Sequence, residues 1–136
     1  MWALENLSIQ PLQNLGLKSQ FETDEQFLKF AQYCTKRGLQ SLESLLGKSA
    51  GKFCVGDEIS IADLCLVPQI YNAVTRYDTP GLFMNKTQET EQNQHQTWRQ
   101  MVAENYPTVS KVYDNLLKEE LFIVTHPKNI KSKILQ

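Results

Sequence analysis

The sequence predicts an all-helical bundle built around a buried, capped core helix at about residues 60–77. Ser60 is followed three residues later by Asp63, which is the spacing of a capping box at a helix start. The helix that follows has no polar face, and such a helix normally lies in the middle of a protein. Residues 24–46 form a second helical pattern, with apolar side chains every three or four positions, and no segment alternates like a strand.

The start of the core helix carries two further signals. We expect the Ser60 hydroxyl to accept from the Asp63 amide, and the Asp63 carboxylate to accept from the Ser60 amide, so that both residues form a structural N-cap. Ile59 and Leu64 occupy the two positions of a hydrophobic staple. The residues of this helix that we expect to be largely buried are Ile61, Leu64, Leu66, Val67 and Ile70.

The segments before the core helix contain their own start signals. Residues 1–8 are predicted to end a helix, and Pro11 allows a new helical turn after a break. Thr23 and Gln26 form a second capping box in front of the long amphipathic helix of residues 24–46.

After the core helix, the pattern changes to a polar insertion at about residues 79–105. Residues 87–97 include no apolar side chain, so this stretch cannot bury enough surface to offset the entropy of ordering it. We therefore expect residues 82–97 to be poorly ordered. Pro107 suits the first turn of the next helix. A short last helix is predicted at residues 119–125. The segment of residues 128–136, which is basic overall, is predicted to form a frayed tail.

Composition limits the class of protein. A chain of 136 residues fits a single domain, residues 1–136. The net charge of −1 argues against nucleic-acid and membrane partners, and the core helix is shorter than the roughly 20 apolar residues of a membrane span. The three cysteines have no metal-ligand spacing, which predicts no metal site and a reducing, cytoplasmic compartment.

Three segments resemble one protein family. The sequence CVGDEISIADLCLVPQ, residues 54–69, resembles the capped core helix in the C-terminal helical domain of cytosolic glutathione transferases. The sequence of this segment is most similar to that of the zeta class, the maleylacetoacetate isomerases. The segments IQPLQNL, residues 9–15, and LFIVTHP, residues 121–127, resemble the same class. The similarity covers roughly residues 5–78 and 106–127.

This resemblance implies an enzyme that uses glutathione as cofactor and a small organic acid as substrate. The implied reaction is the cis–trans isomerisation of maleylacetoacetate in phenylalanine and tyrosine catabolism. In that family a thioredoxin-like N-terminal domain stabilises the thiolate, and full-length members form homodimers. This chain contains no motif of that domain, so we expect a helical substrate-side domain that is inactive alone. The alternative is a truncated or splice-variant helical module without catalysis, which acts as a binding or interaction domain.

The same resemblance assigns the candidate site residues. Gln10, Asn14, Leu15 and Gly16 match positions that line the glutathione cleft, and Arg76 matches an arginine that holds a substrate carboxylate. From the residues alone, Arg76 is equally well explained as a cation that favours the C-terminal end of a helix dipole. No residue of this chain is predicted to be catalytic, because neither the cysteines nor the histidines have a suitable sequence neighbour.

Overall fold

The computed structural model describes residues 15–78 and 97–134, and every named element in these ranges is a helix. The prediction of an all-helical fold is confirmed. The elements are the 3-10 helix η3 (Leu15–Gln20) and the α-helices α2 (Asp24–Ser49), α3 (Ile61–Asp78), α4 (Trp98–Asn105), α5 (Pro107–Leu116), α6 (Glu120–Thr125) and α7 (Pro127–Ile134).

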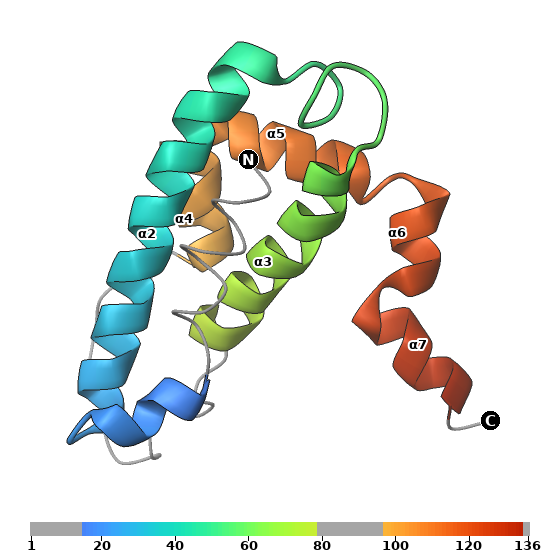
Figure 1. Cartoon of the computed structure of the whole chain (residues 1–136). Coiled ribbons are helices and arrows are strands. Elements are labelled where there is room, and N and C mark those ends of the chain that lie inside the picture. Colours follow the sequence, from blue (N-terminus) through green and yellow to red (C-terminus); the bar gives the residue numbers. More distant parts are fainter. Residues whose placement is uncertain (1–14, 79–96, 135–136) are drawn as a thin grey trace.

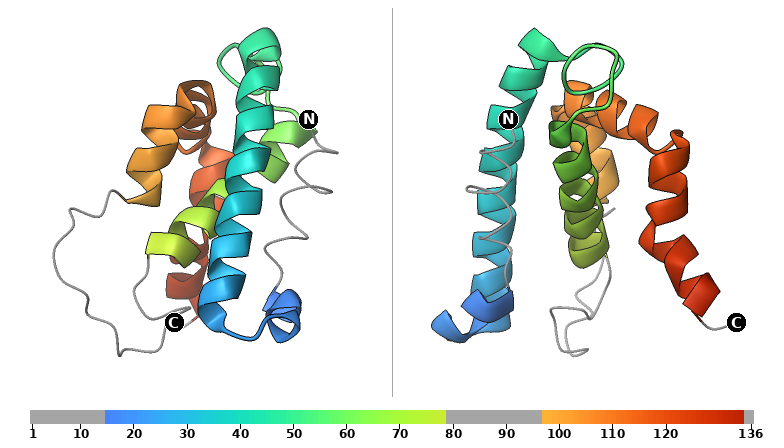
Figure 2. Two further views of the ribbon diagram at one scale, coloured as in Figure 1. Left: turned by 90° about the vertical axis from the view of Figure 1, so that its left-hand side faces the viewer. Right: turned by 45° about the vertical axis from the view of Figure 1, so that its right-hand side comes forward.

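Two long antiparallel helices, α2 and α3, organise the bundle (Figure 1). Helix α5 packs against both of them from behind, and α4 packs against α3 and α5. Helices α6 and α7 lie on the side of α3 that faces away from α2 (Figure 2). One buried apolar cluster joins these elements, and its largest fully buried members include Leu39, Leu42, Leu46, Leu66, Ile70, Val102, Val109, Val112 and Leu116. Helix α3 therefore contributes to the centre of the core, as the sequence predicts.

The burial of α3 differs from the prediction in one respect. Leu66, Val67 and Ile70 are buried as expected, but Ile61 and Leu64 are 65% and 46% exposed. The prediction for these two residues was wrong because α4 and α5 pack against α3 on the side of Leu66 and Ile70, whereas Ile61 and Leu64 point away from that side. An all-round apolar pattern does not reveal how many of a helix's faces have neighbours.

The buried carboxylate of Asp63 holds the start of α3. Asp63 is 0% exposed, and its oxygens accept from the Ser60 amide at 2.8 Å and from the Cys54 amide at 2.9 Å. The Ser60 hydroxyl donates to the same carboxylate at 2.7 Å, and the Asp63 amide donates to the Ser60 carbonyl at 3.1 Å. One half of the predicted capping box is confirmed. The other half is replaced by a hydroxyl–carboxylate bond because a carboxylate is the stronger acceptor.

The loop between α2 and α3 is folded tightly enough to bring Cys54 to Asp63. Its residues Ala50 and Gly56 form an isolated bridge, and Gly56 has a φ of 64°, which favours glycine. The Asp57 carboxylate accepts from the Lys52 amide at 2.7 Å. A Cβ atom on Gly51 would lie 2.7 Å from the Gly56 carbonyl oxygen, and the backbone cannot move aside as a side chain can, so this close approach also requires glycine.

A side chain of α2 caps the N-terminus of α5. The two carboxylate oxygens of Glu43 accept from the amides of Thr108 and Val109, each at 2.9 Å. The residue before this helix, Tyr106, makes no side-chain cap bond of its own. Glu43 therefore provides acceptors for two of the amides that have no partner within the first turn of a helix, and it joins two elements that are far apart in the sequence.

The remaining helix ends agree in part with the sequence patterns. Thr23 caps α2 by accepting from the Gln26 amide at 3.2 Å. Helix α4, which starts with a complete capping box of Thr97 and Gln100, occupies the end of the expected polar insertion. The chain continues as α7 where a frayed tail was expected. The predicted poor order of residues 82–97 and the predicted helix end at residues 1–8 fall outside the described residues, except for Thr97.

The first prediction concerns the cap of α3. Substitution Asp63→Ala should lower the free energy of unfolding by about 3 kcal/mol, because three hydrogen bonds to a buried carboxylate disappear and two amides lose their acceptor. Urea unfolding measures this loss. Ser60→Ala, which removes only one of the three donors, is the matched control and should cost about 1 kcal/mol. Equal losses for the two variants would contradict the central role of Asp63.

The second prediction concerns the cap of α5. Glu43→Gln keeps the length of the side chain but removes its charge and one acceptor oxygen, so it should lower the free energy of unfolding by about 1–2 kcal/mol. The control is Glu25→Gln, because Glu25 makes an exposed ion pair with Lys29 and its charge lies in the first turn of α2, so its loss should cost less than the loss of the Glu43 charge. The two urea midpoints should differ, and a Glu43→Gln midpoint as high as that of the control would refute the cap.

Candidate functional site

The candidate site lies at the end of the molecule that carries both η3 and the last turn of α3. Arg76 is half-buried in that turn, and η3 lies at the same end, beside the start of α2 (Figure 1). A small apolar cluster connects the two elements: it is formed by Phe27 and Ala31 of α2, with Leu17, Phe21, Leu28 and Tyr77 packed against it. Tyr77, the residue next to Arg76, thus packs on the same cluster as Leu17 of η3.

Tyr77 anchors the end of α3 that carries Arg76. The Tyr77 hydroxyl lies 3.1 Å from Thr35 Oγ1, and the Thr35 hydroxyl itself donates to the Ala31 carbonyl at 2.8 Å. The Tyr77 hydroxyl is therefore the donor to Thr35. The Tyr77 ring also packs against the Trp98 ring, with 4.4 Å between centroids. These contacts hold the backbone beside Arg76 against both α2 and α4.

Tyr77 and its neighbour Cys34 are both held in their neutral forms. Burial raises the pKa of the Tyr77 hydroxyl, although the positive charge of Arg76 partly opposes this shift. Burial also raises the pKa of the Cys34 thiol, and Arg37 only partly offsets it. A thiol with a raised pKa is a poor nucleophile at neutral pH, because the thiolate is the reactive form. Cys34 and Tyr77 therefore stabilise the site by packing and supply no reactive anion.

The structure places the predicted cleft residues only in part. Gln10 and Asn14 lie outside the described residues. Leu15 begins η3, and Gly16 is exposed, with its carbonyl accepting from the Ser19 hydroxyl at 3.2 Å. The structure brings the start of η3 and Arg76 to the same end of the bundle, where Leu17 and Tyr77 pack on one cluster.

Sequence reasoning missed the residues that fix this end of the molecule. Thr35 continues the buried stripe of Phe27 and Ala31 along α2, and a hydroxyl at a core position is a signal that a buried polar partner exists. That partner, Tyr77, is 42 residues away, which no local pattern indicates.

Other kinds of site find little support in the described part of the chain. Residues 15–78 and 97–134 contain no group of three or more His, Cys, Asp or Glu side chains arranged to hold a metal ion. Among the helices of the same ranges, none has the length and apolar character needed to cross a membrane. None of the three cysteines forms a disulfide bond.

Comparisons with known proteins agree on one family. The model of the glutathione S-transferase C-terminal domain matches residues 12–88, which is more than half of the chain. The chain belongs to this glutathione S-transferase family. Its fold is similar to the crystal structure of a glutathione S-transferase from Legionella pneumophila, with a TM-score of 0.65 and 25% identity, over 90% of this chain and 56% of the other.

Curated relatives of this glutathione S-transferase domain include several maleylacetoacetate isomerases. The chain is 41% identical over 122 residues to the probable maleylacetoacetate isomerase 1 of Drosophila melanogaster, which covers 88% of this chain and 39% of the relative. It is 38% identical over 120 residues to the Mus musculus enzyme, covering 88% and 44%. The Dictyostelium discoideum enzyme is 37% identical over 128 residues, covering 89% and 47%. The chain thus spans less than half the length of these three relatives.

The third prediction tests the anchor beside Arg76. Tyr77→Phe should lower the free energy of unfolding by about 1 kcal/mol at pH 7, because the bond to Thr35 is lost. Since the pKa of Tyr77 is raised in the folded state, its stabilising contribution is complete below the unfolded pKa of about 10 and is lost as the pH rises above it. The deficit of the variant should therefore shrink in urea unfolding at pH 10.5.

The control for this prediction is Tyr33→Phe, which changes a hydroxyl on a side chain that is largely exposed. Its free energy of unfolding should match that of the original chain at pH 7. A Tyr77→Phe deficit that stays constant between pH 7 and pH 10.5 would contradict the raised pKa.

Proposed function

We propose that this chain supplies the helical, substrate-side part of a zeta-class, glutathione-dependent maleylacetoacetate isomerase. The observation that carries the proposal is the 37–41% identity to maleylacetoacetate isomerases over 88–89% of the chain. In this role the protein would act in phenylalanine and tyrosine catabolism in the cytoplasm. Three cysteines without disulfide bonds are compatible with that compartment.

Arg76 is the proposed binding residue for a carboxylate of the substrate. Its guanidinium carries a permanent charge and a planar set of donors that matches a carboxylate. Its half-burial strengthens such a pair relative to a fully exposed one, and Tyr77 fixes the adjacent backbone through Thr35 and Trp98. The favourable position of a cation in the last turn of α3 is compatible with this role and contributes to stability as well.

Gln10, Asn14, Leu15 and Gly16 are the proposed lining of the glutathione cleft. The position of η3 at the same end as Arg76 supports the assignment for Leu15 and Gly16. When bound, glutathione supplies the thiol whose addition to the cis double bond and later elimination let that bond rotate. The residues of this chain orient the acid: Arg76 holds its carboxylate, so that the double bond is presented to the cleft.

The groups that stabilise the thiolate are proposed to belong to a thioredoxin-like domain outside these 136 residues. The match to only 39–47% of the length of the relatives leaves room for such a domain. The chain alone should then be inactive, because none of its residues is proposed to be catalytic. The complete enzyme would be a homodimer.

The second candidate function is a helical binding or interaction module without catalysis. The exposed apolar side chains of Ile59, Ile61 and Leu64 at the start of the central helix favour this alternative, because exposed apolar residues that are close together often mark a surface that binds a partner. The two candidates differ in one respect: only the first predicts that the chain becomes part of an active enzyme when an N-terminal domain is joined to it.

The fourth prediction separates these candidates. The 136-residue chain is compared with a chimera that carries, ahead of it, the part of the Mus musculus isomerase that lies N-terminal to the matched region. With glutathione and maleylacetoacetate, the chain alone should not exceed the glutathione-only rate, whereas the chimera should turn over. In the chimera, Arg76→Gln should raise KM about tenfold, through the loss of one charge-assisted bond.

The control variant for the chimera is Lys111→Gln, which removes an exposed cation on α5 and should leave KM unchanged. A chimera that unfolds cooperatively but shows no turnover would favour the module without catalysis. An unchanged KM in Arg76→Gln would refute only the role of Arg76.

A further inference from the structure

The last turn of α3, which carries Arg76, is in contact with the first residue of α4. Tyr77 follows Arg76 directly, and its ring packs against the ring of Trp98, with 4.4 Å between the centroids and 43° between the ring planes. Trp98 belongs to the main core cluster and is only 8% exposed. The family model matches residues 12–88, so this contact comes from an element that begins after the matched region ends.

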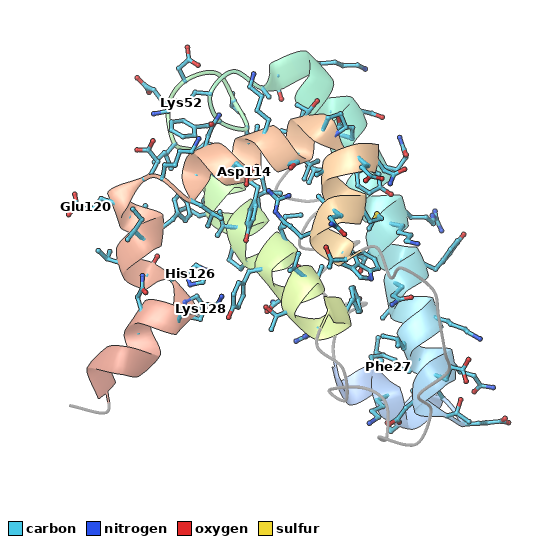
Figure 3. All side chains as sticks on the ribbon, turned by 180° about the vertical axis from the view of Figure 1, so that it is seen from behind. Phe27, Lys52, Asp114, Glu120, His126 and Lys128 are labelled. Atoms are coloured by element: carbon cyan, nitrogen blue, oxygen red, sulfur yellow. The ribbon has the colours of Figure 1, made fainter. Side chains whose placement is uncertain are left out.

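Helix α4 is anchored to the rest of the bundle, so it offers the end of α3 a fixed support. Its other buried residue, Val102, has no exposed surface. The Arg99 guanidinium donates from Nη1 to Ser110 Oγ at 2.9 Å and from Nη2 to the Asp114 carboxylate on α5 (Figure 3, where Asp114 is labelled). Because Arg99 follows Trp98 directly, its bonds to α5 also restrict the movement of the Trp98 ring.

Tyr77 connects this support to Arg76. The Tyr77 hydroxyl bonds to Thr35 of α2, whereas its ring packs on Trp98 of α4. Burial raises the pKa of Tyr77 and the positive charge of Arg76 partly opposes this shift, which places the guanidinium within electrostatic range of the Tyr77 hydroxyl. The end of a helix opens more easily than its middle, because its last carbonyls have no partner within the helix. Without the Trp98 ring, the turn that carries Arg76 loses its aromatic contact to α4 and should open more often.

We propose that Trp98 is a positioning residue for Arg76: its ring keeps the last turn of α3 closed, so that the guanidinium is held where a substrate carboxylate binds. This inference rests on the proposed function, because it takes Arg76 as the residue that binds the substrate. Apparent affinity falls in proportion to the fraction of molecules in which a site is formed. Because Trp98 acts only through Tyr77 and Arg76, its loss should raise KM and leave kcat nearly unchanged.

The first experiment measures amide hydrogen exchange in the 136-residue chain. Trp98→Leu should speed exchange at residues 74–77 about two- to tenfold relative to that at residues 66–70, which is the expected effect of losing one aromatic pair. Val102→Ala is the matched control, because it also removes buried apolar atoms from α4 but lies one turn away from Trp98. It should lower the urea midpoint without changing the ratio of exchange rates between the two ranges.

The second experiment measures steady-state kinetics in the chimera described above. Trp98→Leu should raise KM for maleylacetoacetate about two- to fivefold and change kcat little, whereas Val102→Ala should leave KM unchanged. Trp98→Phe keeps a ring against Tyr77, so its KM should lie closer to that of the original chimera than to that of Trp98→Leu. In a double-mutant cycle, Trp98→Leu should raise KM no further when Arg76→Gln is already present, because the residue that Trp98 positions is gone.

Two outcomes would overturn this inference while leaving the proposed function intact. One is an unchanged ratio of exchange rates in Trp98→Leu. The other is an increase in KM that persists in full when Trp98→Leu is combined with Arg76→Gln, since a general loss of packing would act independently of Arg76. A lack of turnover in the unsubstituted chimera would instead refute the proposed function, and this inference with it, so the two kinds of failure are distinguishable.

Discussion

The structure depends on one buried carboxylate, that of Asp63. It starts α3 by accepting from the Ser60 amide and hydroxyl, and it fixes the preceding loop by accepting from the Cys54 amide. That loop is tied back to the end of α2, where the Ser49 hydroxyl donates to the Cys54 carbonyl at 2.9 Å. A charge with no exposed surface is stable only when its hydrogen bonds are complete, so the loop and the helix start must form together.

The other end of α3 is held by a different polar contact. Tyr77 packs against both apolar clusters and donates to Thr35, so it connects α3 to α2 at the end where Arg76 lies. Between Asp63 and Tyr77, the helix contributes Leu66, Ile70 and Ala73 to the main apolar cluster. The position of Arg76 thus depends on the packing of its neighbour Tyr77, and the carboxylate-binding role that we propose for Arg76 depends on the same contacts.

The two faces of α3 have different roles in the structure: one forms part of the core, and the other leaves apolar side chains exposed. The face with Leu66 and Ile70 packs with α2, α4 and α5 and supplies the core. The face with Leu64 and Pro68 borders helices α6 and α7, which contact the bundle through Phe122 and the ring of His126. A helix that is apolar on every side therefore provides both the stability of the bundle and an accessible apolar surface, and the second property makes partner binding at this face physically reasonable.

The sequence by itself determined the helical class, the family, the start of α3 and the long amphipathic helix, because these depend on bonds and periodicities within about four residues. Tertiary structure alone decided that Ile61 and Leu64 stay exposed and that Glu43 caps a helix 65 residues later. It also decided the partners of Asp63 at Cys54 and of Tyr77 at Thr35. The physical reason is the same in each case: a buried polar group is satisfied by whichever donor or acceptor packing brings near, and local sequence does not encode that neighbour.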